Sequence, residues 1–169
     1  FIRLNGNTVG CVANRSEDGE KKYDAALTAA GCQKAADFIN FCDAFNIPVL
    51  TLVNVRGYQA SKCTEKSIAK AAGRLTYAYA NASVPKVTVI AKDALGSAGL
   101  TMGSKSLGTD IVYAWTGASI GMMDAKEAAK IMYAKEIEAA GDAVALINEK
   151  AGEYAALQSS ALSAAKRGY

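Results

Sequence analysis

Residues 85–102 constrain the fold of this chain more than any other stretch. They begin with an apolar run, Lys86-Val87-Thr88-Val89-Ile90-Ala91, and continue through the small residues of Gly96-Ser97-Ala98-Gly99 into Leu100-Thr101-Met102. The apolar run predicts a buried strand, and the small residues after it predict a turn into a helix. A strand that leads directly into a helix is typical of α/β domains.

The turn at residues 96–99 is the candidate reactive site. The first backbone N–H groups of a helix have no acceptor within the helix, so small residues there leave donors open to a carbonyl group or an oxyanion. Gly96 and Gly99 lack the side chains that would block such an approach. The alternative is close packing of strand on helix without a ligand, and the residues by themselves favour that alternative.

Other segments extend the alternation of strand and helix. Residues 49–55 are apolar on both faces, as expected in a sheet that is covered on both sides. Apolar residues at spacings of three and four predict helices over residues 31–45 and 68–78. The fold class predicted from these patterns is α/β. Periodicity alone does not separate a Rossmann-like sheet from a spiral of ββα units.

The remaining segments give weaker expectations. Asn5-Gly6-Asn7 predicts a hairpin turn, and residues 14–23 read as a solvated loop. We also expect a short helix over residues 100–107 ended by Gly108, a buried strand over 110–115 and a short strand over 118–123. Further helices are expected from Asp124 toward Ala139, after Asp142, and at the end of the chain with Ser160 as its cap.

The composition removes several classes of function. The 169 residues include no His, which excludes Ser-His-Asp and Cys-His catalysis and His-based zinc sites. The four cysteines form no Cys-x-x-Cys pair, so we expect buried free thiols and no metal site. A net charge of +3 without basic blocks does not indicate nucleic acid. No apolar run is long enough to cross a bilayer, so we expect no membrane insertion and a cytoplasmic location.

Five stretches that follow one another along the chain resemble a known family. They are residues 43–53, Tyr77-Ala78-Tyr79-Ala80, residues 84–90, Met102-Gly103-Ser104-Lys105 and Ala134-Lys135-Glu136. They are similar to the carboxyltransferase subunits of biotin-dependent acyl-CoA carboxylases, such as the propionyl-CoA carboxylase β-subunit. The α-subunits of methylmalonyl-CoA and glutaconyl-CoA decarboxylases share the same stretches.

The resemblance implies a crotonase-like fold, a spiral of ββα units with helices at the C-terminal end. It identifies residues 1–169 as a single domain like the C-terminal, biotin-side lobe of a two-lobe subunit, with the N-terminal lobe absent. The implied cofactor is biotin on a carrier protein, with an acyl-CoA as substrate and no metal in this lobe. The implied partners are the biotin carboxyl carrier protein, the N-terminal lobe and further copies of the subunit, as a dimer or a trimer of dimers.

The resemblance also implies an activity and site residues. The family transfers a carboxyl group between carboxybiotin and the α-carbon of an acyl-CoA of the propionyl-CoA or methylmalonyl-CoA type. Backbone N–H groups hold the enolate and the ureido anion, which needs no His. The family's Gly-Gly-Ala turn matches Gly96, Ser97 and Ala98, which are therefore the expected catalytic residues. Gly57 and Tyr58 match a Gly-Phe pair that lines the biotin pocket, although Tyr58 is equally interpreted as a half-buried strand residue.

The chain departs from the family at several of these positions. Ser97 replaces a Gly, Arg56 replaces a Pro, and Asp124 and Glu127 replace two glycines. Two further functions therefore stay open, a non-catalytic lobe that holds a carboxylase complex together and a stand-alone crotonase-type enzyme that acts on an acyl-CoA. The residues name neither the acyl group nor the direction of transfer.

Overall fold

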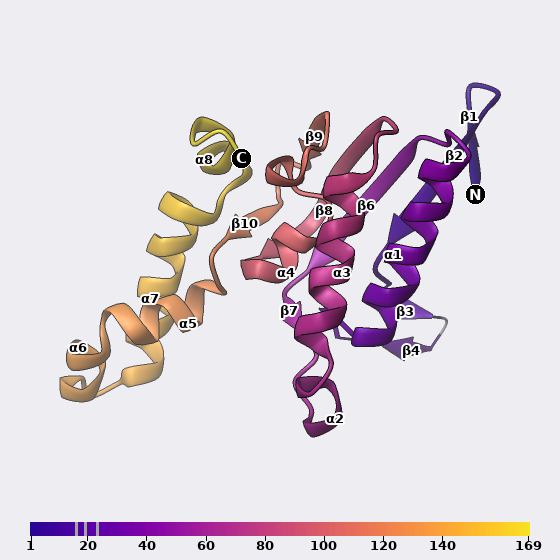
Figure 1. Cartoon of the computed structure of the whole chain (residues 1–169). Coiled ribbons are helices and arrows are strands. Elements are labelled where there is room, and N and C mark those ends of the chain that lie inside the picture. The colour runs from indigo at the N-terminus through magenta and orange to yellow at the C-terminus, as the bar shows by residue number, and fades with distance from the viewer. Residues whose placement is uncertain (16, 19, 23) are drawn as a thin grey trace.

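A mostly parallel sheet forms the centre of the computed structural model, which describes residues 1–15, 17–18, 20–22 and 24–169 (Figure 1). Within these residues, the strands run in the order β1-β2-β6-β8-β10, and β9 also pairs with β8. The pair β1–β2 is antiparallel and the other pairs are parallel. The predicted α/β class is confirmed. The strands of this sheet are β1 (Ile2–Leu4), β2 (Asn7–Ala13), β6 (Val49–Val55), β8 (Lys86–Leu95), β9 (Ile111–Ala114) and β10 (Ser119–Gly121).

Short strands and helices surround this sheet. The short strands are β3 (Glu17–Asp18), β4 (Lys21–Lys22), β5 (Ala26–Leu27) and β7 (Gly57–Tyr58). The helices are α1 (Ala29–Ala44), α2 (Lys62–Glu65), α3 (Ile68–Asn81), α4 (Gly96–Thr101), α5 (Ala125–Met132), α6 (Ala134–Ala139), α7 (Ala143–Tyr154) and α8 (Ala161–Lys166), with a 3₁₀ turn η1 (Lys105–Leu107) and a π-helical turn η2 (Ala155–Ser159). No helix of the described residues is long and apolar enough to cross a membrane.

Helices α1 and α3 lie side by side against the sheet (Figure 1). The side chain of Thr28 caps α1 by accepting a hydrogen bond from the N–H of Gly31. Ile39 from α1 and Leu75 from α3 are fully buried, which stabilises the fold by roughly 1.5–3 kcal/mol for each side chain. The apolar face predicted for α3 is confirmed, whereas Phe45, at the end of the face predicted for α1, is exposed.

Two charged residues hold the turn between α3 and β8. One carboxylate oxygen of Asp43 accepts hydrogen bonds from the N–H (2.7 Å) and the hydroxyl (3.0 Å) of Ser83, and the backbone bond is the main cause that lowers the pKa of Asp43. The buried ammonium group of Lys86 donates to the carbonyl oxygens of Tyr79 (2.9 Å) and Ala82 (2.5 Å). Carbonyl groups at the C-terminal end of a helix lack an N–H donor within the helix. The Lys86 cation supplies that donor and stabilises the helix end.

Strand β9 corrects the expectation of a buried strand over residues 110–115. Ile111, Tyr113 and Trp115 are 47%, 58% and 63% exposed. The reason is the position of β9 at the edge of the sheet, where β8 is its only partner among the described strands. The short strand expected over residues 118–123 contains β10, which pairs with the last residues of β8.

Three further expectations need smaller corrections. The helix expected from Asp124 toward Ala139 is broken at Tyr133 into α5 and α6. Residues 14–23 include the β3–β4 hairpin, and residues 16, 19 and 23 lie outside the described part. All four thiols are free, but only Cys32 and Cys42 are buried, and burial raises the pKa of both; Cys63 is exposed.

Candidate functional site

Strand β8 leads directly into α4, so the predicted small-residue turn is the first turn of a helix. Gly96 has φ +60, a left-handed conformation that glycine adopts readily. A Cβ atom on Gly99 would lie 2.7 Å from the carbonyl carbon of Ala94, closer than any side chain can come. Both glycines therefore bring the helix close to the strand that precedes it. The helix starts at Gly96, earlier than the residue 100 expected from the sequence.

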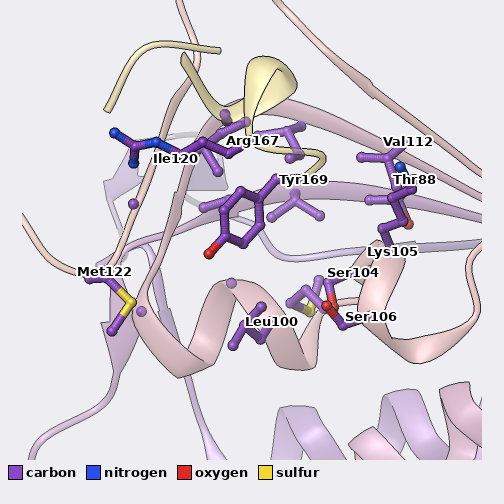
Figure 2. A pocket seen from close by; sticks show the side chains of 18 of the residues that line it. Thr88, Leu100, Ser104, Lys105, Ser106, Val112, Ile120, Met122, Arg167 and Tyr169 are labelled. Carbon is purple, nitrogen blue, oxygen red and sulfur yellow. The ribbon is translucent and has the colours of Figure 1, made fainter. Parts of the chain in front are cut away.

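A cavity of about 720 Å³ lies beside α4. Figure 2 shows α4 beneath the cavity, and the ring of Tyr169 projecting from the C-terminal segment over Leu100. The wall includes Gly96, Ser97 and Gly99. Its other members are mostly apolar, among them Val53, Ile90, Leu100, Met102, Val112, Ile120 and Met122. The cavity therefore joins an apolar surface to the backbone of the α4 N-terminus.

The structure places the three predicted catalytic residues differently. Gly96 and Ser97 line the cavity, whereas Ala98 is only 1% exposed and its side chain belongs to the core. The N–H groups of Ser97 and Ala98 lie in the first turn of the helix. In the described part of the chain, neither N–H group donates a hydrogen bond to a residue outside α4.

The two predicted biotin-binding residues are not in the cavity wall. Gly57 and Tyr58 form β7, which pairs with β5. Tyr58 reaches α4 from outside the cavity, because its hydroxyl lies 2.8 Å from the hydroxyl oxygen of Thr101. The Thr101 hydroxyl in turn donates to the carbonyl oxygen of Ser97 at 2.9 Å. Tyr58 thus contacts α4 at Thr101, and neither residue is among those that line the cavity.

Arg56 joins three segments near the start of α4. Its guanidinium lies 2.8 Å from one carboxylate oxygen of Asp124 and 3.4 Å from one of Asp93. The other oxygen of Asp124 caps α5 by accepting from the N–H of Lys126 at 2.9 Å. The sequence predicted this cap but not the ion pair; the available signal was that Arg56 and Asp124 both replace family residues without side-chain charge.

Glu127 lies three residues after Asp124, the spacing of a capping box, but its carboxylate does not bond back to Asp124. Its carboxylate pairs instead with Lys130, one turn further along α5, at 2.8 Å. Glu65 and Lys66 are exposed. Among the described residues, no group of three or more Cys, Asp or Glu side chains is arranged to hold a metal ion.

Sequence reasoning missed the residues that cover the cavity. Arg167 and Tyr169 line it from the C-terminal segment, and Lys105 lines it from η1 (Figure 2). Lys105 also donates to the carbonyl oxygen of Gly168 at 3.2 Å, which joins the two segments. Met122 also lines the cavity and is 74% exposed. No local pattern reports these contacts, because the segments are far apart in the sequence.

Comparison with known proteins places these features in one family. The family model described as "Carboxyl transferase domain" matches residues 1–169. The methylmalonyl-CoA carboxyltransferase 12S subunit of Propionibacterium freudenreichii subsp. shermanii is 42% identical over 155 residues, 91% of this chain and 29% of that protein. The propionyl-CoA carboxylase beta chain of Saccharopolyspora erythraea is 42% identical over 174 residues, 100% of this chain and 31% of that protein.

A solved structure has the same fold. The transcarboxylase 12S structure with methylmalonyl-coenzyme A and methylmalonic acid bound, described as a hexamer assembly, matches with a TM-score of 0.89 and 40% identity, over 98% of this chain and 31% of that one. This chain thus spans about a third of the length of these relatives. The crotonase-like α/β fold expected from the resemblance is confirmed. The chain belongs to the carboxyl transferase domain family.

Proposed function

We propose that this chain takes part in carboxyl transfer between carboxybiotin and an acyl-CoA of the methylmalonyl-CoA or propionyl-CoA type. The observation that carries the proposal is the position of the first turn of α4. Gly96 and Ser97 border a cavity of about 720 Å³, and the N–H groups of Ser97 and Ala98 donate to no described residue outside the helix. The names of the relatives supply the reaction class.

The cavity is suited to a small ring system. Its wall is mostly apolar, as in most small-molecule sites, and backbone donors lie at one end. Leu100 and Met122 would contact the ring faces, and Gly96 and Ser97 would lie nearest its polar edge. Biotin, when bound, supplies the ureido group that carries the carboxyl group. Gly96 has no side chain that would keep the biotin ureido group from the backbone N–H groups. The side chain of Ser97 narrows the access of the ureido group to them.

The role proposed for Ser97 and Ala98 is electrostatic. Carboxyl transfer develops negative charge on an oxygen atom, and fixed N–H donors stabilise such charge strongly where water is excluded. Neither donor has to give up a hydrogen bond to another described residue outside α4 to do so. Removing one donor of this kind typically costs about 100- to 1,000-fold in kcat.

The proposal extends to partners that the chain by itself does not contain. We place the chain as the biotin-side lobe of a subunit that also has an acyl-CoA-binding lobe, working with a biotin carboxyl carrier protein in a homo-oligomer. The support is the hexamer assembly of the 12S relative, of which this chain matches 31%. The expected cytoplasmic location stays a prediction.

Replacement of Ala98 by Pro tests the proposed donors. Proline removes the N–H group, and the first turn of a helix tolerates it better than later turns do. We expect kcat for carboxyl transfer from methylmalonyl-CoA to free biotin to fall about 100-fold. The full-length protein that carries this chain is assayed with purified components.

Two controls accompany this variant. Ser97→Gly restores the family residue, keeps both N–H groups and should retain the activity. Circular dichroism checks that Ala98→Pro keeps its helix content. A folded Ala98→Pro protein with unchanged kcat would contradict the assigned donors, and a wild type that transfers no carboxyl group to biotin would contradict the reaction itself.

A second candidate function is a non-catalytic assembly lobe. The observation in its favour is a set of exposed apolar side chains on α5 and α7, where Ile131 and Val144 are each 68% exposed. Such side chains are typical of surfaces that contact another protein. An assembly lobe would keep its oligomeric state while the wild-type protein neither binds biotin nor transfers a carboxyl group.

A further inference from the structure

We propose that Tyr58 and Thr101 are positioning residues that strengthen the Ala98 N–H group as a hydrogen-bond donor. The two hydroxyls form a chain that ends on the carbonyl oxygen of Ser97, and that carbonyl belongs to the same peptide group as the Ala98 N–H. The inference rests on the proposed function for its catalytic consequence, whereas the hydrogen-bond chain is a feature of this chain's own residues.

The direction of the hydrogen bonds follows from the number of protons. A threonine hydroxyl has one hydrogen, and that of Thr101 is donated to the Ser97 carbonyl oxygen at 2.9 Å. The hydroxyl of Tyr58 lies 2.8 Å from the same Thr101 oxygen, so it must be the donor in that pair. The order is therefore Tyr58 to Thr101 to Ser97, with every hydrogen pointing toward the peptide group.

This arrangement polarises the peptide group. A donor on a carbonyl oxygen withdraws electron density through the conjugated C–N bond, which makes the N–H on the other side more acidic. Successive hydrogen bonds in a chain strengthen one another, by roughly 10–30% for each bond. Thr101 is only 5% exposed, so water competes little for these groups. The Ala98 N–H is thereby prepared for an anionic acceptor.

A hydroxyl bonded to the carbonyl four residues earlier is common in helices and by itself has a local structural role. Two observations go further here. The second hydroxyl comes from a different element, since Tyr58 lies in β7, and the carbonyl that receives the chain belongs to the peptide group at the candidate site. Tyr58 is also not among the residues that line the cavity.

Kinetics of the full-length protein test the catalytic consequence. Thr101→Val keeps the shape of the side chain and removes its hydroxyl, so kcat for transfer to biotin should fall about three- to tenfold with KM nearly unchanged. Thr101→Ser keeps the hydroxyl and should keep kcat. Tyr58→Phe should lower kcat by a smaller factor. This factor should disappear in the Thr101→Val background, because the hydrogen-bond chain from Tyr58 to the Ser97 carbonyl oxygen is then already broken.

Thr109→Val is the matched control. The hydroxyl of Thr109 also donates to a backbone carbonyl, that of Gly103 at 2.8 Å, and the residue is also 5% exposed, but it does not line the cavity. It should lower stability about as much as Thr101→Val and leave kcat unchanged. Equal kcat values for Thr101→Val and the wild type, or equal losses for Thr101→Val and Thr109→Val, would overturn the inference.

A spectroscopic readout is independent of activity. Chains labelled with ¹³C-carbonyl serine and ¹⁵N alanine give NMR signals only from Ser-Ala peptide groups, which are Ser97-Ala98, Ser160-Ala161 and Ser163-Ala164. Thr101→Val should move the ¹³C signal of the Ser97 carbonyl upfield and shift the ¹⁵N signal of Ala98, while the signals of the other two Ser-Ala peptide groups stay unchanged. Tyr58→Phe should shift the same two signals by less. Unchanged Ser97 and Ala98 signals in Thr101→Val would refute the hydrogen-bond chain. Shifted signals in a protein without transferase activity would refute only the proposed function.

Discussion

At the scale of single residues, Gly99 shows how tightly α4 is joined to the strand before it. A Cβ atom there would meet the backbone of Ala94, which has no freedom to move aside because it pairs with Ile120 in the sheet. The cavity wall at Gly96 and Ser97 depends on this short distance. Strain at residue 99 should therefore be transmitted to the candidate donors one and two residues earlier.

Gly99→Ala should destabilise the protein by about 1–3 kcal/mol, the usual cost of an overpacked contact. Urea unfolding followed by circular dichroism measures the change. Gly73→Ala is the matched control, because residue 73 is an exposed position in the middle of α3 where a Cβ atom meets nothing within 4 Å. The control should stabilise the protein by about 0.5–1 kcal/mol through helix propensity. Equal changes in the free energy of unfolding for the two variants would mean that α4 can move away from Ala94 at little cost.

The residue scale is also where prediction from sequence was most uneven. Gly96, Ser97 and Gly99 were identified as a turn with open backbone donors, because small residues after an apolar strand have few other reasons to occur together. Tyr58 had two equal interpretations, a residue of the biotin pocket, from its match in the family, and a half-buried strand residue. Its hydroxyl contact with Thr101 depends on how β7 lies against α4, and nothing in the order of the residues reports that placement.

At the scale of elements, the turn between α3 and β8 sets the start of the strand that leads to the site. Asp43 lies on α1 and accepts hydrogen bonds from the residues that follow α3, so one carboxylate connects two helices to β8. The lowered pKa of Asp43 records the preference of these donors for the charged form. Stability should depend on pH through this group.

Asp43→Ala should remove stability of about 1–2 kcal/mol at neutral pH. The contribution of Asp43 is fully present above its unfolded pKa of about 3.9 and is lost as the pH falls through its lower folded pKa. Denaturant unfolding of the two proteins at several pH values between neutrality and this range measures the difference. The difference in the free energy of unfolding between wild type and variant should decrease as the pH is lowered. A difference that is independent of pH would show that the carboxylate charge contributes nothing.

Elements differed in how far the sequence predicted them, for physical reasons. The position of β6 and the buried face of α3 were predicted correctly because their apolar patterns are local, although Leu52 on one face of β6 is exposed and not covered as expected. The exposure of β9 was not, because an apolar run looks the same at the edge of a sheet as at its centre. The break at Tyr133 between α5 and α6 also has no marker such as Pro or Gly.

At the scale of the whole molecule, one group of exposed apolar side chains lies on the helices α5 and α7. Figure 1 shows α5, α6 and α7 at the opposite end of the molecule from β1. Ile131, Met132 and Val144 are more than 60% exposed on these helices. A surface of this kind fits the homo-oligomer proposed above, since its contact with another subunit would remove apolar area from water.

Ile131→Glu and Val144→Glu should each weaken self-association of the full-length protein, because an unpaired carboxylate at an apolar interface is costly to bury. Sedimentation velocity at several concentrations measures the assembly size, and a shift to smaller species is expected. Gln33→Glu adds the same charge at an exposed polar position of α1 and should leave the size unchanged. Wild-type assembly in both apolar-site variants would exclude this surface as the interface.

The cavity has a floor and a cover that arise from different parts of the chain. Helix α4 and strand β8 form the floor, whereas Arg167 and Tyr169 cover it from a segment that meets the sheet at the bridge between Ser119 and Ser160. Substitutions in the cover change the space above α4 without altering the strand-to-helix turn. Residue changes in the C-terminal segment therefore alter the shape of what fits the cavity, while the backbone donors belong to a separate segment.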